Sequence, residues 1–230
     1  MEIEGARASD AQIYEEMGRR FLGLGNIGAR HWFCGLEPGG TDAPNWPRRW
    51  ATYYHGAEVI DGRLEVNDPT HARFFGPNAS LQRTWGPLIS TFLAFRGERA
   101  DEASALEFQR DHFHSGDGAT CLLELSGYAA PNLSIESPRD RYLAERTLRI
   151  RELMALHRPY FLLCYGVKRR QDFEQLVGGP FDDQGFRNVG PTVCALVRHP
   201  RPARGAALTS EWWVALGRDL RRRSDALGAR

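Results

Sequence analysis

Four positions in the chain place a polar side chain or a glycine at the end of a short apolar run. The first run is HWFCGL, and Glu37 follows it within the stretch FCGLEPGG. The second run, ATCLLEL, contains Glu124; the third, YFLLCYG, ends at Gly166; and the fourth, TVCALVRH, ends at His199. If the four runs are neighbouring strands, an acid and a histidine meet at one edge, which suggests hydrolysis or group transfer.

The four runs have the composition of buried parallel strands. Each is short, rich in large apolar residues and closed by Gly, Ser or Pro. Helical patterns surround them, over SDAQIYEEMGRRFLGLG, SPRDRYLAERTLRIRELMALHRP, KRRQDFEQLVG and SEWWVALGRDLRRR. In the second of these, Ser137 and Pro138 are expected at the N-cap and first helical position, and the helix stops before Pro159. The alternation predicts an α/β fold with a parallel sheet and right-handed crossovers.

The length and composition indicate one domain over residues 1–230. With 230 residues, of which 42% are hydrophobic, the chain can fill a core without disulfides or metal. Residues 41–118 are expected to form a long insertion at the carboxyl end of the first strand, with a helix in TWGPLISTFLAF and a hairpin across AEVIDGRLEV. No apolar run approaches the roughly 20 residues that span a bilayer. We therefore expect a cytoplasmic monomer that does not bind membranes.

Cysteine and histidine spacing does not favour a metal site. The cysteines are far apart, form no CxxC pair and lie inside the apolar runs, so we expect four buried thiols. His112 and His114 have the spacing of a metal pair on a strand, but without nearby Cys or carboxylates we expect them to be exposed to solvent.

The net charge of +1 argues against a protein that binds polyanions over its whole surface. Basic residues are nevertheless concentrated toward the C-terminus. Arg221 to Arg223 are expected on the solvated face of a last helix, whereas Arg198, Arg201 and Arg204 fall in one short loop.

Four segments together resemble the uracil-DNA glycosylase superfamily. They are GLEPGG, CLLELSGYAAPN, HRPYFLLCYG and RHPRPARGAALTSEWW, in the order and context of that family's motifs. The resemblance covers about residues 28–225 and is weaker between 45 and 115. It implies a three-layer α/β/α fold with a central four-stranded parallel sheet, in agreement with the pattern of runs.

The resemblance implies a DNA glycosylase of base excision repair. Such an enzyme flips uracil, or another deaminated base such as hypoxanthine or xanthine, out of DNA and hydrolyses its N-glycosidic bond without metal or organic cofactor. Bond cleavage gives the sugar cationic character and leaves the base as an anion. In the positions that match the two motifs, Glu37 would stabilise the sugar cation and His199 would donate a hydrogen bond to the departing base. The other interpretation of Glu37 is an ion-paired or helix-capping residue.

The same resemblance implies a base-binding set of Gly35, Leu36, Pro38, Phe75 and Glu124. An aromatic side chain is expected to stack on the flipped base, and residues 41–118 offer Trp46, Trp50, Tyr53, Phe74 and Phe75. Of these we select Phe75, in the stretch RFFGP, and leave the others open. Glu124 departs from the family, which has an Asn at this position. A carboxylate accepts a hydrogen bond from uracil N3–H but repels O4, so the base range could be wider. The alternative for Glu124 is a buried ion pair with an arginine.

The loop with Arg198, Arg201 and Arg204 would contact DNA, either phosphates or the space that the flipped base leaves. Two other functions remain open: a non-catalytic DNA- or nucleotide-binding member of the same fold, and an unrelated hydrolase of small nucleosides. The first would bind DNA with a steep salt dependence, and the second would not.

Overall fold

The computed structural model describes residues 9–38, 46–52, 54–63, 72–128, 138–201 and 207–228. The strands are β1 (Gly23–Gly25), β2 (His31–Gly35), β3 (Val59–Ile60), β4 (Thr120–Glu124), β5 (Phe161–Tyr165), β6 (Phe186–Val189) and β7 (Thr192–Val197). The helices are α1 (Asp10–Arg20), α2 (Trp46–Thr52), α4 (Trp85–Arg96), α5 (Glu102–Asp111), α6 (Leu143–His157), α7 (Arg170–Val177) and α8 (Ser210–Ala226), with a 3-10 turn, η2 (Val167–Arg169), before α7.

The strands form one mostly parallel sheet in the order β3-β1-β4-β2-β5-β7-β6. Its centre, β4-β2-β5-β7, is parallel throughout and consists of the four runs predicted from the sequence. The predicted total of four strands is wrong, because β1 pairs antiparallel with β4, β6 pairs antiparallel with β7, and β3 pairs with β1. These three additional strands are short, so their sequences carry little apolar pattern.

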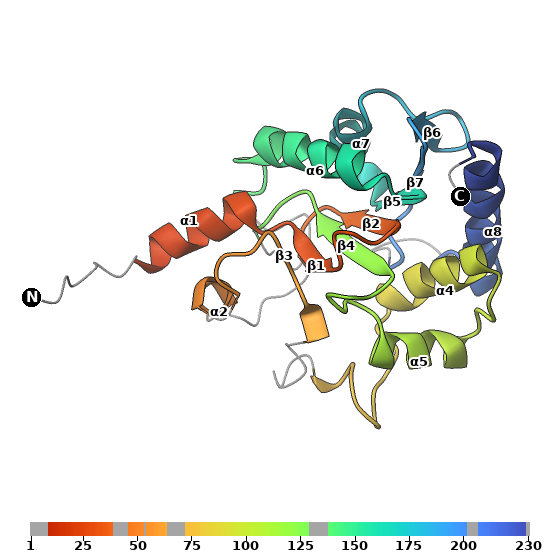
Figure 1. Cartoon of the computed structure of the whole chain (residues 1–230), viewed down its shortest axis with the longest axis horizontal. Helices are drawn as coiled ribbons and strands as arrows, with labels where there is room; N and C mark the ends of the chain where they lie inside the picture. Colours follow the sequence, from red (N-terminus) through yellow and green to blue (C-terminus); the bar gives the residue numbers. More distant parts are fainter. Residues whose placement is uncertain are drawn as a thin grey trace, which may run out of the picture.

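Helices pack against both faces of this sheet (Figure 1). Alternate residues of the central strands point to opposite faces. On one face, Phe33 and Leu163 lie in a core shared with α4, α5 and α8. On the other face, Trp32 and Leu162 lie in a core shared with α6 and α7. The central strands are therefore covered on both sides, which explains their continuous apolar sequences.

Helix α4 runs antiparallel to the central strands. Near its C-terminus, Phe95 packs against His31 and Phe161, the first residues of β2 and β5. Its N-terminal end therefore points toward the carboxyl ends of the strands. Helix α8 lies beside α4 in the same direction, because Trp213 accepts a hydrogen bond from Thr91 through its carbonyl while Gly217 lies further along, against Ala94.

The predicted helices are present, with one early end and one displaced start. Helix α1 ends at Arg20, and Gly23–Gly25 of its predicted span form β1. Helix α1 begins with a capping box in which Ser9 and Gln12 exchange hydrogen bonds. Helix α6 ends before Pro159 as predicted, but it begins at Leu143 and not beside Pro138, since residues 139–142 form turns. In the expected hairpin over AEVIDGRLEV, Val59–Ile60 instead pairs in parallel with β1; residues 64–66 lie outside the described residues.

The expected long insertion, residues 41–118, contributes directly to this fold where it is described. It supplies the sheet strand β3, and it supplies α4 and α5, which help to build one of the two cores. A helix was predicted at the position of α4, whereas α5 was not predicted.

All four cysteines are buried and unpaired, as predicted. The prediction for the histidine pair is half wrong: His112 is exposed, but His114 is buried beside Phe113 and Trp85. Neither histidine lies on a strand, since the chain turns after α5.

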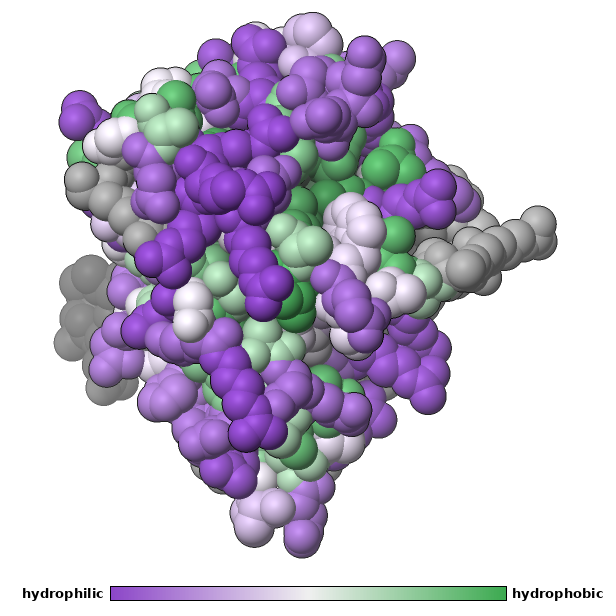
Figure 2. All heavy atoms as spheres, turned by 90° about the vertical axis from the view of Figure 1, so that its right-hand side faces the viewer, coloured by the Kyte–Doolittle hydropathy of each residue, from purple (hydrophilic) through white to green (hydrophobic). Residues whose placement is uncertain are grey.

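The arginines of α8 pair mainly with acids on the same helix. Arg222 and Arg223 contact Asp219, and Arg221 contacts Asp225. This is the solvated helix face predicted from the sequence. Helix α8 lies on the side of the molecule that Figure 2 turns to the viewer, and that side is largely hydrophilic. In the part of the chain that the structure describes, we find no helix with the length and apolar character to cross a bilayer.

Candidate functional site

The last residues of the central strands lie side by side at one edge of the sheet. Gly35 of β2 is paired with Glu124 of β4, and Tyr165 of β5 is paired with Val197 of β7. Beyond the strands, the N–H of Ser126 still donates to the carbonyl of Leu36, at 2.6 Å. The polar residues that follow these strands are thereby held close together, at the edge where open α/β sheets bind ligands.

Glu37 is held in a bidentate ion pair. Arg139, which precedes α6, donates from Nε to Oε2 at 2.7 Å and from its terminal nitrogen to Oε1 at 3.1 Å. Both side chains are largely buried, with 11% exposed for Arg139 and 7% for Glu37. Burial raises the pKa of Glu37 above its ordinary value, whereas the ion pair with Arg139 opposes that rise. The ion-paired interpretation left open by the sequence is therefore what the structure contains.

A second arginine, Arg169, extends this charged cluster. It precedes α7 and forms ion pairs with Asp140 and Asp172. Asp140 directly follows Arg139, so the two arginines and their acids form one network over the sheet edge. The charges of Arg169 and Asp140 both act on Glu37, in opposite directions.

Glu124 is buried at the end of β4 and forms no ion pair among the described residues. Arg146 of α6 donates to the main-chain oxygens of Glu124 and Leu125, each at 2.7 Å, and leaves the carboxyl group alone. Burial raises the pKa of Glu124 to about 8, and the negative charge of Glu37 adds to the rise. Among the described residues, Glu124 therefore lacks the ion pair with an arginine that was one alternative from the sequence. The positive charge of Arg146 still lowers the pKa of Glu124 and partly offsets the effect of burial.

Tyr165 connects Glu124 to His199. Its hydroxyl stands beside the Glu124 carboxyl group, over the backbone of Gly35. Its ring meets the His199 ring edge-on, with the ring centres 5.4 Å apart. Part of His199 is exposed, yet desolvation still lowers its pKa below the ordinary value. The neutral form of His199 is therefore favoured over a wider pH range than that of a free imidazole.

The orientation of His199 is set by its own loop. The N–H of Arg201 donates to Nδ1 of His199 at 3.0 Å. In the tautomer where Nδ1 accepts this bond, Nε2 carries the proton and is the hydrogen-bond donor. The carbonyl oxygen of Arg201 also lies 2.8 Å from Nδ1, so in the other tautomer Nδ1 donates to it and Nε2 is an acceptor.

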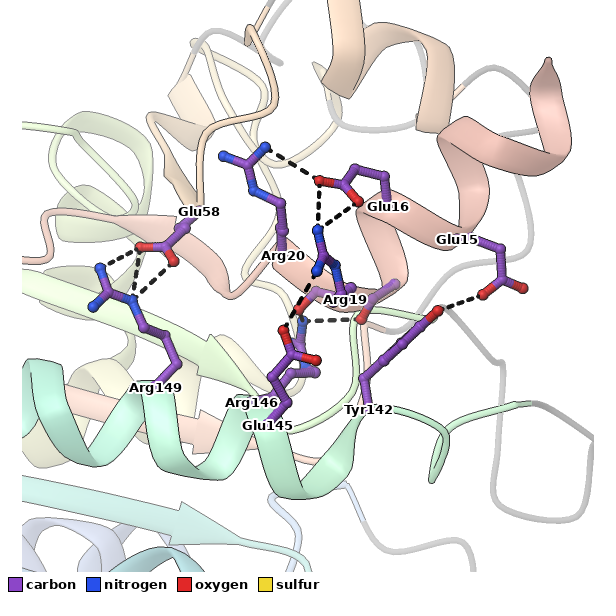
Figure 3. Close-up of polar contacts among 10 residues, drawn as sticks. Glu15, Glu16, Arg19, Arg20, Glu58, Tyr142, Glu145, Arg146 and Arg149 are labelled. Carbon is purple, nitrogen blue, oxygen red and sulfur yellow. Dashed lines mark hydrogen bonds and ion pairs between the residues drawn. The ribbon is translucent and has the colours of Figure 1, made fainter. Parts of the chain in front are cut away.

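Arg146 connects this edge of the sheet to helix α1. Besides its bonds to β4, it donates to the carbonyls of Gly18 and Arg19 at the end of α1. Figure 3 shows it among exposed ion pairs between α1, α6 and the loop before β3, including Arg149 with Glu58. These contacts fix the layers of the fold; they are distinct from the charged network at Glu37.

The remaining predicted residues have different positions. Leu36 and Pro38 flank Glu37 and are half-buried. Phe75 is buried, and the aromatic ring it meets among the described residues is Trp85, at the start of α4. Arg198 and Arg201 are exposed beside His199, and Arg204 lies outside the described residues.

Three residues of the site were not predicted: Arg139, Tyr165 and Arg169. The position of Tyr165 could have been predicted from the sequence. It is the last residue of the third run before Gly166, and Gly166 was predicted to lie at this edge of the sheet. The sequence carries no such signal for Arg139, because its partner Glu37 lies 102 positions away. Arg169 pairs with Asp172, three positions along the chain, and with the distant Asp140. Among the described residues, no three His, Cys, Asp or Glu side chains are grouped so that they could hold a metal ion.

Chemically, the edge offers a carboxylate in an ion pair with an arginine, a buried carboxyl group with a pKa of about 8, and an imidazole whose neutral form is favoured. These groups can stabilise a cation, bind a polar ligand edge and donate to a leaving group. No known family model matches the chain, and no curated protein matches it significantly.

Proposed function

We propose that the chain is a DNA glycosylase that releases uracil or another deaminated base from DNA by hydrolysis. The observation that carries the proposal is the grouping of four polar side chains at the carboxyl edge of the sheet: Glu37, Glu124, Tyr165 and His199. Glu37 follows β2, whose last residue pairs with Glu124. Tyr165 places its hydroxyl beside the Glu124 carboxyl group and its ring against His199. Each of these four residues lies in one of the four segments in which the sequence resembles the uracil-DNA glycosylase superfamily. Helices on both faces of the sheet agree with the three-layer arrangement expected from that resemblance.

In this proposal Glu37 supplies the negative charge that stabilises the developing sugar cation and orients water. The bond to Arg139 is compatible with this role, because each carboxylate oxygen keeps a further lone pair beyond the one that Arg139 uses. Arg139 also favours the ionised form, against the effect of burial. Arg139 is thus a positioning residue that holds the carboxylate in place.

His199 donates from Nε2 to the oxygen of the departing base in the same proposal. Its neutral form suits this role, because a neutral imidazole still has one N–H donor. The edge-on contact with Tyr165 and the bond from Arg201 set the direction of the ring.

The first test is base release from duplexes that carry uracil, hypoxanthine or xanthine, with alkaline cleavage of the abasic sites. Glu37→Gln keeps the size of the side chain but removes its charge, so we expect activity to fall at least about tenfold, the scale of 1.4 kcal/mol in a barrier. Glu58→Gln is the matched control. Glu58 also pairs with an arginine, Arg149, but on another side of the fold, and its loss should leave base release unchanged.

Base release by Glu37→Gln at the rate of the unaltered protein would remove Glu37 from the mechanism. A second function is favoured by one observation, namely that both oxygens of Glu37 are engaged by Arg139: a non-catalytic protein that binds DNA. Salt-dependent DNA binding with no base release from any of the three duplexes would support that function and overturn the glycosylase proposal.

A further inference from the structure

The carboxyl group of Glu124 has an unusual environment for a charged side chain. Only 8% of the residue is exposed, and its Oε2 atom is buried without a hydrogen-bond partner among the described residues. An unpaired buried oxygen lowers the stability of the folded state, unless a bound molecule completes its hydrogen bonding. This oxygen is therefore a candidate contact for a ligand.

Gly35 determines where the Glu124 carboxyl group can lie. A Cβ atom added at Gly35 would overlap Oε2 of Glu124 and lie 2.5 Å from the hydroxyl oxygen of Tyr165. The Glu124 carboxyl and the Tyr165 hydroxyl therefore stand together over the bare backbone of Gly35. Any side chain at position 35 would displace both groups.

The charged and titratable groups around Glu124 come from several elements. Glu37 follows β2, Cys34 lies in β2, Tyr165 ends β5 and Arg146 comes from α6 on the opposite face. Burial is the largest influence and raises the pKa of Glu124 to about 8, Glu37 adds to this, and Arg146 and Tyr165 oppose it. At neutral pH the side chain is mostly a neutral carboxylic acid.

Resting on the proposed function, we infer that Glu124 binds its ligand as a neutral carboxylic acid, which offers one hydrogen-bond donor beside one acceptor. The partner of such a pair is a ring edge with a carbonyl next to an N–H, the lactam edge of uracil, hypoxanthine and xanthine. An ionised carboxylate has no donor and repels the ligand carbonyl. Protonation therefore lets Glu124 present the same donor and acceptor pair as an amide side chain.

This inference changes the expectation for base range. From the sequence, an ionised carboxylate at this position was expected to repel O4 of uracil and so to widen the range of bases. Protonated Glu124 binds both polar atoms of the lactam edge. This binding is lost only when the pH rises above the pKa of Glu124.

The test is the pH dependence of binding of free uracil and free hypoxanthine to the full chain, followed by ligand-observed NMR. For the unaltered protein, affinity should fall about tenfold between pH 7 and pH 9, because the neutral fraction of a group with a pKa of about 8 falls by that factor. Glu124→Gln has a permanent donor and acceptor pair. At pH 9 this variant should bind the bases more tightly than the unaltered protein does. Its affinity should change with pH only through ionisation of the free base, an effect that is the same for both proteins.

Tyr165→Phe provides a second variant that keeps the ring and removes the hydroxyl. Because the Tyr165 hydroxyl lowers the pKa of Glu124, removal of this hydroxyl should move the midpoint of the binding curve to higher pH. This variant tests the inference even where Glu124→Gln fails to fold, which a melting curve would reveal.

Equal pH dependence in the unaltered protein and Glu124→Gln would overturn the inference, as would affinity that rises with pH. Absence of binding by uracil and hypoxanthine at every pH would overturn it too, whether or not the chain releases bases from DNA. If the bases bind with the expected pH dependence but no duplex loses its base, the glycosylase proposal fails and the role of Glu124 stands.

Discussion

Replacing Glu124 by Gln should alter how the stability of the protein depends on pH, whatever the protein binds. The pKa of Glu124 rises from 4.5 to about 8 on folding, chiefly through burial. Between these two values the folded state holds a proton that the unfolded state has released. The free energy of unfolding therefore falls as the pH rises from about 4.5 to about 8, and the Gln side chain has no such dependence.

The size of the effect follows from the shift. Well inside this range, the free energy of unfolding falls by about 1.4 kcal/mol for each unit of pH. Between pH 6 and pH 8, where the group approaches its folded pKa, the loss is about 2 kcal/mol. For a chain of this length, that corresponds to a difference of about 4 to 8 °C in melting temperature.

Urea unfolding of both proteins at pH 6 and pH 8 measures this directly. Other titrating groups contribute equally to both proteins, so the difference between the two pH changes isolates Glu124. We expect the unaltered protein to lose about 2 kcal/mol more than Glu124→Gln over this interval. Identical pH changes in the two proteins would refute a buried, protonated Glu124.

Two further substitutions test the packing that positions the site. Arg146→Ala should lower the free energy of unfolding by about 3 kcal/mol or more, because it leaves buried carbonyls of α1 and β4 without a donor; exposed Arg149→Ala should cost less than about 1 kcal/mol. Equal effects by urea unfolding would contradict the role of Arg146. Gly217→Ala, a change that usually favours a helix, should destabilise the protein by about 1 to 3 kcal/mol, because the added Cβ overlaps the carbonyl oxygen of Thr91. A rise in melting temperature would show that α4 and α8 can separate to admit the methyl group.

The centre of the fold could be predicted from the sequence because buried parallel strands leave a strong local pattern. The runs at Cys34, Cys121, Cys164 and Cys194 are apolar on both faces, and each became a central strand. The strand β1 has the sequence Gly-Leu-Gly and β3 has two residues, so neither carries a pattern that distinguishes a strand from a turn. Their pairing depends on the neighbouring strand and not on their own residues.

The candidate site could be predicted only in part, for a related reason. Glu37, Glu124 and His199 follow strands, and parallel topology alone brings the carboxyl ends of strands together. Arg139 lies 102 positions from Glu37 and contacts it through the turns before α6. Those turns also delay the start of α6 beyond the proline at which a helix was expected. The sequence around Pro138 predicts a helix start, but in the structure this segment forms turns in which Arg139 makes its long-range ion pair with Glu37.

Labelling of the four buried cysteines can measure how often the sheet opens. The cysteines lie on adjacent strands and on one face of the sheet, and Cys34 of β2 stands directly opposite Cys164 of β5. Because burial raises the pKa of each thiol, none presents a reactive thiolate while the sheet is closed. The rate at which a thiol reagent labels each position therefore reports how often its strand is exposed. If the sheet opens as one unit, all four cysteines acquire the label together; if it opens from the β6 edge, Cys194 is labelled before Cys34.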